Sequence, residues 1–214
     1  MKNSHATVYI VDDDMDVRRT LQCLLESDAR RVIAYPSAEA LLADFEPAHP
    51  CCLILDLQLA GLTGQALLEE LRANYATLPV VIITGHVDVS TALRAMRLGA
   101  VDVCQKPVDP EVLLPLIEQT LAADAASERQ RQQIAAARER LARLTARERE
   151  LFKLVVEGQS YKEMASSLGI SPRTVEHHRA NITTKLGMDR VADLVRLGLI
   201  AGEGTLVPAM GYGI

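Results

Sequence analysis

Cys51-Cys-Leu-Ile-Leu-Asp56 is a run of five apolar residues that ends in a carboxylate. A short stretch that is apolar on both faces is typical of a parallel β-strand covered by helices on each side. Pro79-Val-Val-Ile-Ile83 repeats the pattern and is followed by Thr84-Gly85. The two stretches predict neighbouring inner strands, each with a polar residue at its carboxyl end.

Three further stretches predict strands, and helical patterns separate all five. The additional strands are expected at 7–11, 31–35 and 101–105, and the helices near 15–27, 37–45, 64–74, 87–98 and from 109 onward. Ser37 is a predicted N-cap, and Asp109-Pro110 places a cap before a first-turn proline. This alternation predicts an α/β fold with a doubly wound, five-stranded parallel sheet.

Polar residues follow four of the five strands and form the candidate site. They are the triplet Asp12-Asp13-Asp14, then Asp56, Thr84 and Lys106. Ligands of such sheets bind beyond the carboxyl ends of the strands, so these side chains should share one crevice. Carboxylates suit Mg²⁺, and Asp56 would attack a phosphoryl group whose charge the metal, Thr84 and Lys106 stabilise. An acidic residue after a strand more commonly caps the next helix, but all four features in this order favour a site.

Composition and charge indicate two domains with different partners. The chain has 214 residues, of which 49% are hydrophobic and 24% charged, as in ordinary globular proteins. Its net charge of −5 divides into −9 up to Asp124 and +4 beyond it. An acidic part followed by a basic part favours a second domain that binds an anionic partner.

Several classes of protein are disfavoured by what the sequence lacks. No apolar run approaches the length of a membrane span, and the aspartate-rich start does not resemble a signal peptide, so a cytoplasmic protein is expected. Trp is absent and Phe occurs twice, which disfavours stacking on single-stranded nucleic acid. The four cysteines form no C-x-x-C pair and have no histidine at ligand spacing, so neither disulfides nor a structural zinc site is expected.

Residues 6–123 resemble the receiver domain of two-component response regulators, which have a CheY-like fold. The resemblance rests on Val11-Asp12-Asp13, Leu55-Asp56, Thr84-Gly85 and Lys106-Pro107. It implies that Asp56 accepts a phosphoryl group from a phosphohistidine of a sensor histidine kinase, and that Thr84 and Lys106 contact the phosphoryl oxygens. It also implies a Mg²⁺ cofactor held by Asp12, Asp13, Asp56 and the backbone carbonyl of Gln58.

The chain departs from the receiver pattern at three positions. Leu59-Ala60-Gly61 stands where Met-Pro-Gly is usual, so this loop is expected to be looser. Val103 occupies the position of the family's switch aromatic, and Val108 follows Lys106-Pro107 where Phe is common. None of these positions touches the phosphorylation chemistry, but all three bear on the switching that follows it.

A long helix is predicted between the two domains. The stretch 122–143 contains neither Gly nor Pro, while Pro115 lies inside the helix and predicts a kink. Ten positions at 3-4 spacing from Leu113 to Leu144 form a heptad seam that is apolar at both ends and polar in the middle. Two such helices side by side would make a homodimer, and a solvated single helix is the alternative.

The last part of the chain predicts a helix-turn-helix. Thr145 and Glu148 form a capping box for a helix that runs to Gly158, and a second helix follows Ser160. Ser171-Pro172 then starts a third helix that runs to about Leu186, with a fourth expected near 189–199. Val175, Ile182 and Leu186 should face the core of this domain, which leaves a polar face for a ligand.

Residues 144–200 resemble the LuxR-type DNA-binding domain. The resemblance rests on Leu144-Thr-Ala-Arg-Glu-Arg-Glu150, Glu163-Met-Ala165, Gly169-Ile-Ser-Pro-Arg-Thr-Val-Glu176, His178-Arg-Ala-Asn-Ile182 and Lys185-Leu-Gly187. By position, Glu176, His177 and Ala180 face the major groove of double-stranded DNA. Candidates for phosphate contacts are Arg173, Thr174, Arg179 and Lys185.

The domain order resembles that of NarL/FixJ response regulators. The expected parts are a receiver at 1–123, a helical linker at 124–143, a LuxR-type domain at 144–201 and an irregular tail at 202–214. This order implies a phosphorylation-controlled transcription factor, not an enzyme, that dimerises on DNA and has RNA polymerase as a further candidate partner.

Two other functions compete with this interpretation. A phosphatase of the haloacid dehalogenase type would have the motif Asp-x-Asp after the strand, but Asp56-Leu57-Gln58 lacks the second carboxylate. A constitutive DNA-binding dimer whose receiver no longer switches is the stronger alternative. Val103 and Ala60 favour it, whereas the intact acidic cluster with Thr84 and Lys106 argues against it.

Overall fold

The computed structural model describes residues 6–27, 30–85 and 88–203. The chain divides into two compact units, Met1–Glu128 and Arg129–Ile214, and the division lies inside helix α5 (Pro110–Leu141). The predicted tail from 204 onward and position 87 of a predicted helix lie outside the described residues. Within the described part, no helix is long and apolar enough to cross a membrane.

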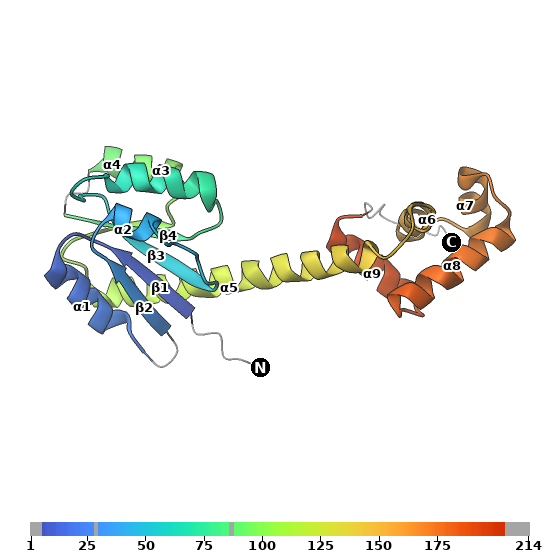
Figure 1. The fold of residues 1–214 in the computed structure, drawn as a ribbon, viewed down its shortest axis with the longest axis horizontal. Coiled ribbons are helices and arrows are strands. Elements are labelled where there is room, and N and C mark those ends of the chain that lie inside the picture. The colour runs from blue at the N-terminus through green and yellow to red at the C-terminus, as the bar shows by residue number, and fades with distance from the viewer. Residues whose placement is uncertain (1–5, 28–29, 86–87, 204–214) are drawn as a thin grey trace, which may run out of the picture. The chain divides into compact units, whose positions relative to one another are not determined.

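The first unit contains the predicted parallel sheet. Its strand order is β2-β1-β3-β4-β5, and all four strand pairs are parallel (Figure 1). The strands are β1 (Ala6–Val11), β2 (Arg30–Tyr35), β3 (Cys51–Asp56), β4 (Val80–Thr84) and β5 (Asp102–Gln105). Because β3 and β4 lie inside the sheet, every residue in them is buried, as the two apolar runs predicted.

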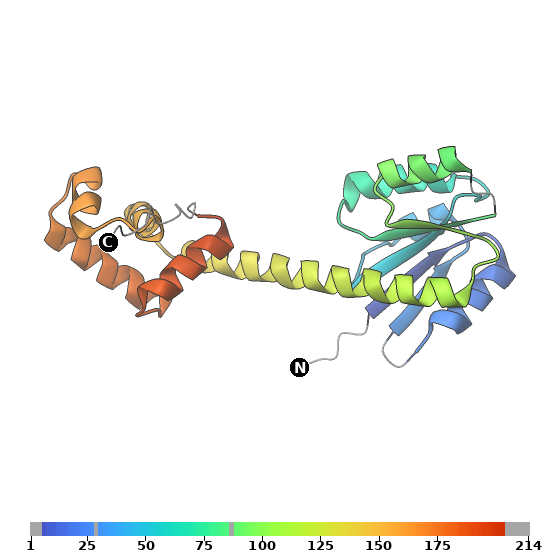
Figure 2. The same cartoon turned by 180° about the vertical axis from the view of Figure 1, so that it is seen from behind.

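Helices cover both faces of this sheet (Figures 1 and 2). One face packs against α2 (Ala38–Leu42), α3 (Gly64–Asn74) and α4 (Val89–Arg97), the other against α1 (Met15–Leu25) and the first part of α5. Helix α2 is shorter than the predicted 37–45, although Ser37 caps it as expected, and α5 continues through Pro115. The carboxyl ends of β1, β3, β4 and β5 therefore meet at one edge, where the candidate site was predicted.

In the second unit, the described residues up to 203 form helices and no strand. After the end of α5 it contains α6 (Ala146–Val156), α7 (Tyr161–Leu168), α8 (Pro172–Leu186) and α9 (Val191–Ala201). The capping boxes at Thr145 and Ser160 are both present, and Gly169 ends α7 in the left-handed conformation, with a φ of 64°. That glycine allows the chain to turn directly into α8, which gives the helix-turn-helix.

The two ends of the predicted seam along α5 pack within the cores of the two units, one end in each. Leu113 and Thr120 are buried, Leu113 in the core of the first unit, and Ala137 and Leu141 are buried in the core of the second. Between them, positions such as Gln130 are exposed. A coiled coil through the whole seam would therefore have to use residues that already pack within each unit.

Candidate functional site

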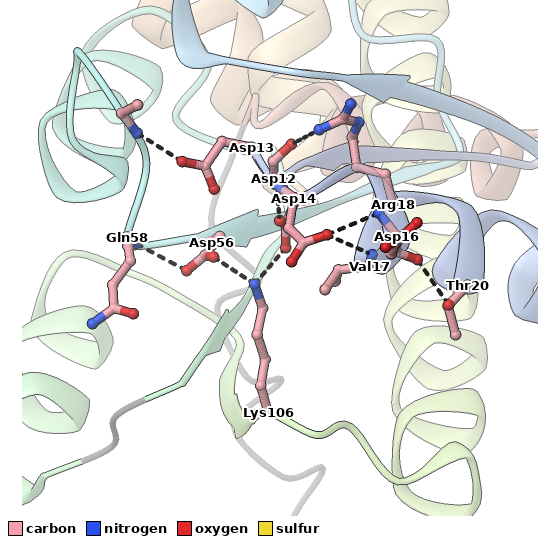
Figure 3. Close-up of polar contacts among 11 residues, drawn as sticks. Asp12, Asp13, Asp14, Asp16, Val17, Arg18, Thr20, Asp56, Gln58 and Lys106 are labelled. Carbon is pink, nitrogen blue, oxygen red and sulfur yellow. Dashed lines mark hydrogen bonds and ion pairs between the residues drawn. The ribbon is translucent and has the colours of Figure 1, made fainter.

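Four strand ends bring the predicted polar side chains of the first unit together, and Figure 3 draws Asp12, Asp56 and Lys106 among them. Asp12 directly follows β1, Asp56 is the last residue of β3, and Thr84 is the last residue of β4; all three are buried. Lys106 follows β5, and its backbone N–H donates to the Thr84 carbonyl at 2.8 Å. The sheet register thus delivers two carboxylates, a hydroxyl and an ammonium to one place.

Lys106 is the hub of this cluster. Its Nζ donates to Asp12 Oδ2 at 2.6 Å and to Asp56 Oδ2 at 2.5 Å, as Figure 3 shows. The Asp12 side chain has no exposed surface and that of Asp56 is only 5% exposed. Two buried carboxylates would be costly without a counter-charge, so the ammonium holds both of them in place.

The backbone completes the hydrogen bonding of the two buried carboxylates. Asp12 Oδ1 accepts from the N–H of Asp14, and Asp56 Oδ1 accepts from the N–H of Gln58, both at 2.9 Å. Asp14 itself points away from the cluster and caps α1 by accepting from the N–H groups of Asp16 and Val17. The capping role considered for the triplet is thus confirmed for Asp14, whereas Asp12 serves the site.

Asp13 is held by the loop after β3. Its Oδ2 accepts from the N–H of Ala60 at 3.1 Å. Proline, usual at this position, has no N–H and could not make this bond. The loop expected to be loose is thereby tied to the site, and the N–H of Leu62 is bound at 2.9 Å by Glu39 Oε1. The sequence does show that position 60 is not proline and therefore has a backbone N–H to donate. Only the fold shows that this N–H donates to Asp13.

The donor atoms fit a hard divalent cation. One carboxylate oxygen each from Asp12, Asp13 and Asp56 lies within 4.8 Å of the others. Oxygen-only donor sets with open positions for water are what Mg²⁺ prefers. Gln58, whose backbone carbonyl was implied as a ligand, lies beside this cluster through its N–H bond to Asp56.

Burial and charge oppose each other in the site. Burial raises the pKa of Asp12, and the hydrogen bond and charge of Lys106 offset this only in part. For Lys106, burial acts to lower the pKa, but the hydrogen bonds and charges of Asp12 and Asp56 outweigh it, and the pKa is raised. Lys106 is therefore an ammonium at neutral pH, able to stabilise additional negative charge.

Gly64 is a site-supporting residue that sequence analysis missed. It begins α3, and a Cβ there would lie 2.1 Å from the backbone oxygen of Asp56 and 2.6 Å from Leu57 Cα. Only a glycine lets the helix start so close to the strand end that carries the acceptor candidate. A lone glycine in a helical pattern gave no sign of this contact.

In the second unit, α8 presents the predicted polar face. Val175, Ile182 and Leu186 are buried as expected, and Arg173, Glu176, His177 and Ala180 are exposed. Thr174 is half-buried, and its hydroxyl hydrogen-bonds to that of the helix cap Ser171 at 2.8 Å. The side chains predicted to face base edges thus occupy the exposed side of α8.

Two of the predicted phosphate-contacting cations already have partners within the unit. Lys185 Nζ donates to the buried Glu148 Oε2 at 2.7 Å, which ties α8 to the capping box of α6. Arg179 lies over the Tyr161 ring at 5.3 Å from its centroid. Of the two, Lys185 has the stronger structural role, because its partner is buried.

Two family models match the chain. Residues 8–118 match the response regulator receiver domain, and residues 142–197 match the bacterial regulatory proteins of the luxR family. The transcriptional regulatory protein FixJ of Azorhizobium caulinodans is 40% identical over 195 residues, covering 91% of this chain and 92% of that protein. FixJ of Rhizobium meliloti is 38% identical over 198 residues, covering 92% and 97%.

Solved structures agree with these matches. The structure of the response regulator StyR has a TM-score of 0.79 at 37% identity, covering 90% of this chain and 98% of that one. Full-length FixJ from B. japonicum has a TM-score of 0.54 at 34% identity, covering 92% and 97%. A receiver with a LuxR-type helix-turn-helix is the architecture of a transcription-regulating response regulator. Within that class, the chain belongs to the NarL/FixJ family.

Proposed function

We propose that this chain is a transcription factor controlled by Mg²⁺-dependent phosphorylation of Asp56 by a sensor histidine kinase. The observation that carries the proposal is the pair of bonds from Lys106 Nζ to Asp12 and Asp56, with a carboxylate oxygen of Asp13 within 4.8 Å of theirs. A carboxylate held beside a cation and an oxygen-rich metal site is what phosphoryl transfer requires. The LuxR-type domain supplies the output.

The chemistry follows from the positions of these groups. An Asp56 carboxylate oxygen would attack the phosphorus of a phosphohistidine; the P–N bond breaks, a P–O bond forms, and the imidazole takes up a proton. Asp12, Asp13, Asp56 and the Gln58 carbonyl would hold Mg²⁺, which neutralises charge on the phosphoryl oxygens when bound. Lys106 has three donors, so it can turn one toward a phosphoryl oxygen and keep a bond to Asp12. Thr84, buried at the end of β4, would contact another oxygen.

Intact-protein mass spectrometry with a small phosphodonor such as acetyl phosphate tests the acceptor. We expect the full chain to gain one phosphoryl group with Mg²⁺ and none with excess chelator. Asp56→Asn should abolish the gain, and Asp13→Asn should raise the Mg²⁺ concentration that half of the gain requires. Asp14→Asn is the matched control, because asparagine also caps helices. Unchanged phosphorylation of the Asp56 variant would overturn the assignment.

DNA contact by α8 is proposed from its exposed polar face. After selection of a binding site from random duplexes, Arg173→Ala should weaken binding to all sequences alike and reduce the salt slope by about one. Glu176→Gln should instead change base preference, because a carboxylate accepts from cytosine N4. Equal effects of Glu176→Gln on all sequences would contradict a base contact.

Homodimerisation is proposed to use the first unit. Three exposed apolar side chains lie on one face of α4, because Val89, Leu93 and Met96 are spaced four and three residues apart. An exposed apolar group of this kind is typical of an interaction surface. A phosphorylation-induced dimer would present two α8 helices to half-sites about one helical turn apart and could then contact RNA polymerase in the cytoplasm.

A further inference from the structure

A second cluster of ligand-type side chains lies at the other end of β3 from Asp56. His49 precedes this strand by two residues, Cys51 is its first residue, and Asp124 reaches it from α5 within the first unit. Sequence analysis singled out no histidine at ligand spacing from a cysteine, whereas the structure places His49 Nδ1 3.6 Å from Cys51 Sγ. His49 and Cys51 are only two residues apart, but their third partner is distant in sequence.

Three different donor atoms converge in this cluster. His49 Nδ1 lies 2.6 Å from Asp124 Oδ2 and 3.6 Å from Cys51 Sγ. The Asp124 carboxylate also accepts from the Cys51 N–H at 2.8 Å. Cys51 has no exposed surface, and the side chains of Asp124 and His49 are 1% and 20% exposed.

The geometry excludes a Cys-His-Asp catalytic arrangement. In such a triad one ring nitrogen faces the nucleophile and the other faces the carboxylate. Here both the thiol and the carboxylate face Nδ1. A substrate also could not reach Cys51, which is fully buried. Convergence of sulfur, nitrogen and oxygen on one point is instead the pattern of a metal site.

We propose that His49, Cys51 and Asp124 bind Zn²⁺ at a site separate from the Mg²⁺ carboxylates. Thiolate, imidazole and carboxylate are the donors of Zn²⁺, at about 2.3 Å for sulfur and about 2.0 Å for nitrogen and oxygen. Tetrahedral angles with these lengths place sulfur about 3.6 Å from nitrogen, as the structure already has it. Nitrogen and oxygen should be about 3.3 Å apart, so the carboxylate must move back by about 0.7 Å when metal replaces the shared proton.

Charge favours this assignment in a buried place. A thiolate and a carboxylate together neutralise Zn²⁺, so the loaded site would carry no net charge into the protein interior. Binding would release the thiol proton to solvent. A water would take the fourth position, with access through the partly exposed His49. The competing interpretation is an ion pair between His49 and Asp124 that joins the start of β3 to α5 without any metal.

Co²⁺ titration of the full, reduced and chelator-treated chain distinguishes the two interpretations. Excess Mg²⁺ is kept present to occupy the acidic site. Thiolate-to-Co²⁺ charge-transfer absorption reports sulfur ligation, which the acidic site cannot produce. We expect one Co²⁺ per chain with this absorption, and its displacement by Zn²⁺ gives the Zn²⁺ affinity.

Matched variants identify the ligands. Cys51→Ala should abolish the absorption, whereas Cys52→Ala, equally buried but on the opposite face of β3, should retain it. His49→Gln and Asp124→Asn should weaken Zn²⁺ binding at least tenfold, because loss even of a residue that only hydrogen-bonds to a metal ligand typically costs about 10- to 100-fold. These two variants decide the question if Cys51→Ala does not fold.

The absence of thiolate absorption in the wild-type chain would overturn the proposal. So would absorption that survives Cys51→Ala, or Zn²⁺ affinity unchanged in both His49→Gln and Asp124→Asn. Because the readout is sulfur ligation, it is independent of whether Asp56 accepts a phosphoryl group.

Discussion

Neighbouring residues of the same type have different roles in this chain. Asp12 is fully buried and bound to Lys106, Asp13 is held by the loop N–H of Ala60, and Asp14 caps a helix. The three roles differ because the triplet lies between the end of β1 and the start of α1, where successive side chains point in different directions. A substitution in the triplet should therefore affect either the proposed metal site or the stability of α1, depending on which position it changes.

Glu148 should make the stability of the second unit depend on acid pH. Its carboxylate accepts from Lys185 and from the Thr145 N–H and hydroxyl, which lowers its pKa below the usual 4.5. A lowered folded pKa gives stability that is complete above about pH 4.5 and is lost as the pH falls through the folded pKa. Because Lys185 is partly exposed, we expect Glu148→Gln to cost about 1–2 kcal/mol at neutral pH.

Calorimetry of the full chain at neutral and acid pH measures this effect. The difference in unfolding free energy between wild type and Glu148→Gln should shrink as the pH falls below 4.5. Glu150→Gln is the control, since that exposed residue of α6 makes only a surface pair with Arg147 and should change stability by less than about 0.5 kcal/mol. A constant difference across pH would show that the Glu148 carboxylate charge is not responsible.

At the scale of elements, the start of α3 lies in close backbone contact with the end of β3, which carries Asp56. Gly64→Ala should destabilise the first unit by more than about 2 kcal/mol, because the new Cβ would clash with backbone at Asp56 and Leu57. Phosphorylation of Asp56 should fall with it, since the strand end must shift. Thermal unfolding followed by circular dichroism, together with phosphorylation by acetyl phosphate, measures both.

Gly85→Ala provides the matched comparison. Among the described residues, a Cβ there would meet only the Gln58 side chain, at 3.6 Å, which is an ordinary contact. We expect a change below about 0.5 kcal/mol and normal phosphorylation. If Gly64→Ala were as stable as Gly85→Ala, close approach of backbone would not be the reason for glycine at position 64.

These elements also show what could be predicted from sequence. The buried strands that end in Asp56 and Thr84 could be predicted from their apolar runs. Parallel topology then predicts that their carboxyl ends lie at the same edge of the sheet. The helix-turn-helix was readable from caps and glycines. Two hydrogen bonds could not be predicted: that from the Ala60 N–H to Asp13 and that from the Cys51 N–H to Asp124. Each joins residues far apart in the sequence, which only the folded chain brings together.

For the whole molecule, α5 alone gives little apolar surface for a partner, because most of its apolar seam residues pack inside one of the two units. We therefore expect the chain to be monomeric without phosphorylation and to dimerise with Mg²⁺ and beryllofluoride, through the apolar residues around α4. Light scattering on wild type and Asp56→Ala measures this, and only the wild type should respond. Leu93→Glu, on the exposed face of α4, should also prevent the dimer.

A dimer insensitive to both beryllofluoride and Asp56→Ala would contradict this expectation. It would favour the alternative of a constitutive dimer, in which Val103 no longer transmits a change. Val103 is partly buried and packs against the core beneath α2–α4.

The burial of Asp124 in the first unit has a practical consequence for protein engineering. A hybrid regulator that joins this input module to a foreign output would be cut most naturally where the acidic domain was predicted to end, after residue 123. That cut would leave His49 and the Cys51 N–H without their carboxylate partner. A junction between 129 and 133 keeps that partner and leaves out Ala137 and Leu141, which belong to the core of the replaced second unit. The exchange point for modular signalling designs is thus set by one aspartate rather than by the domain motifs.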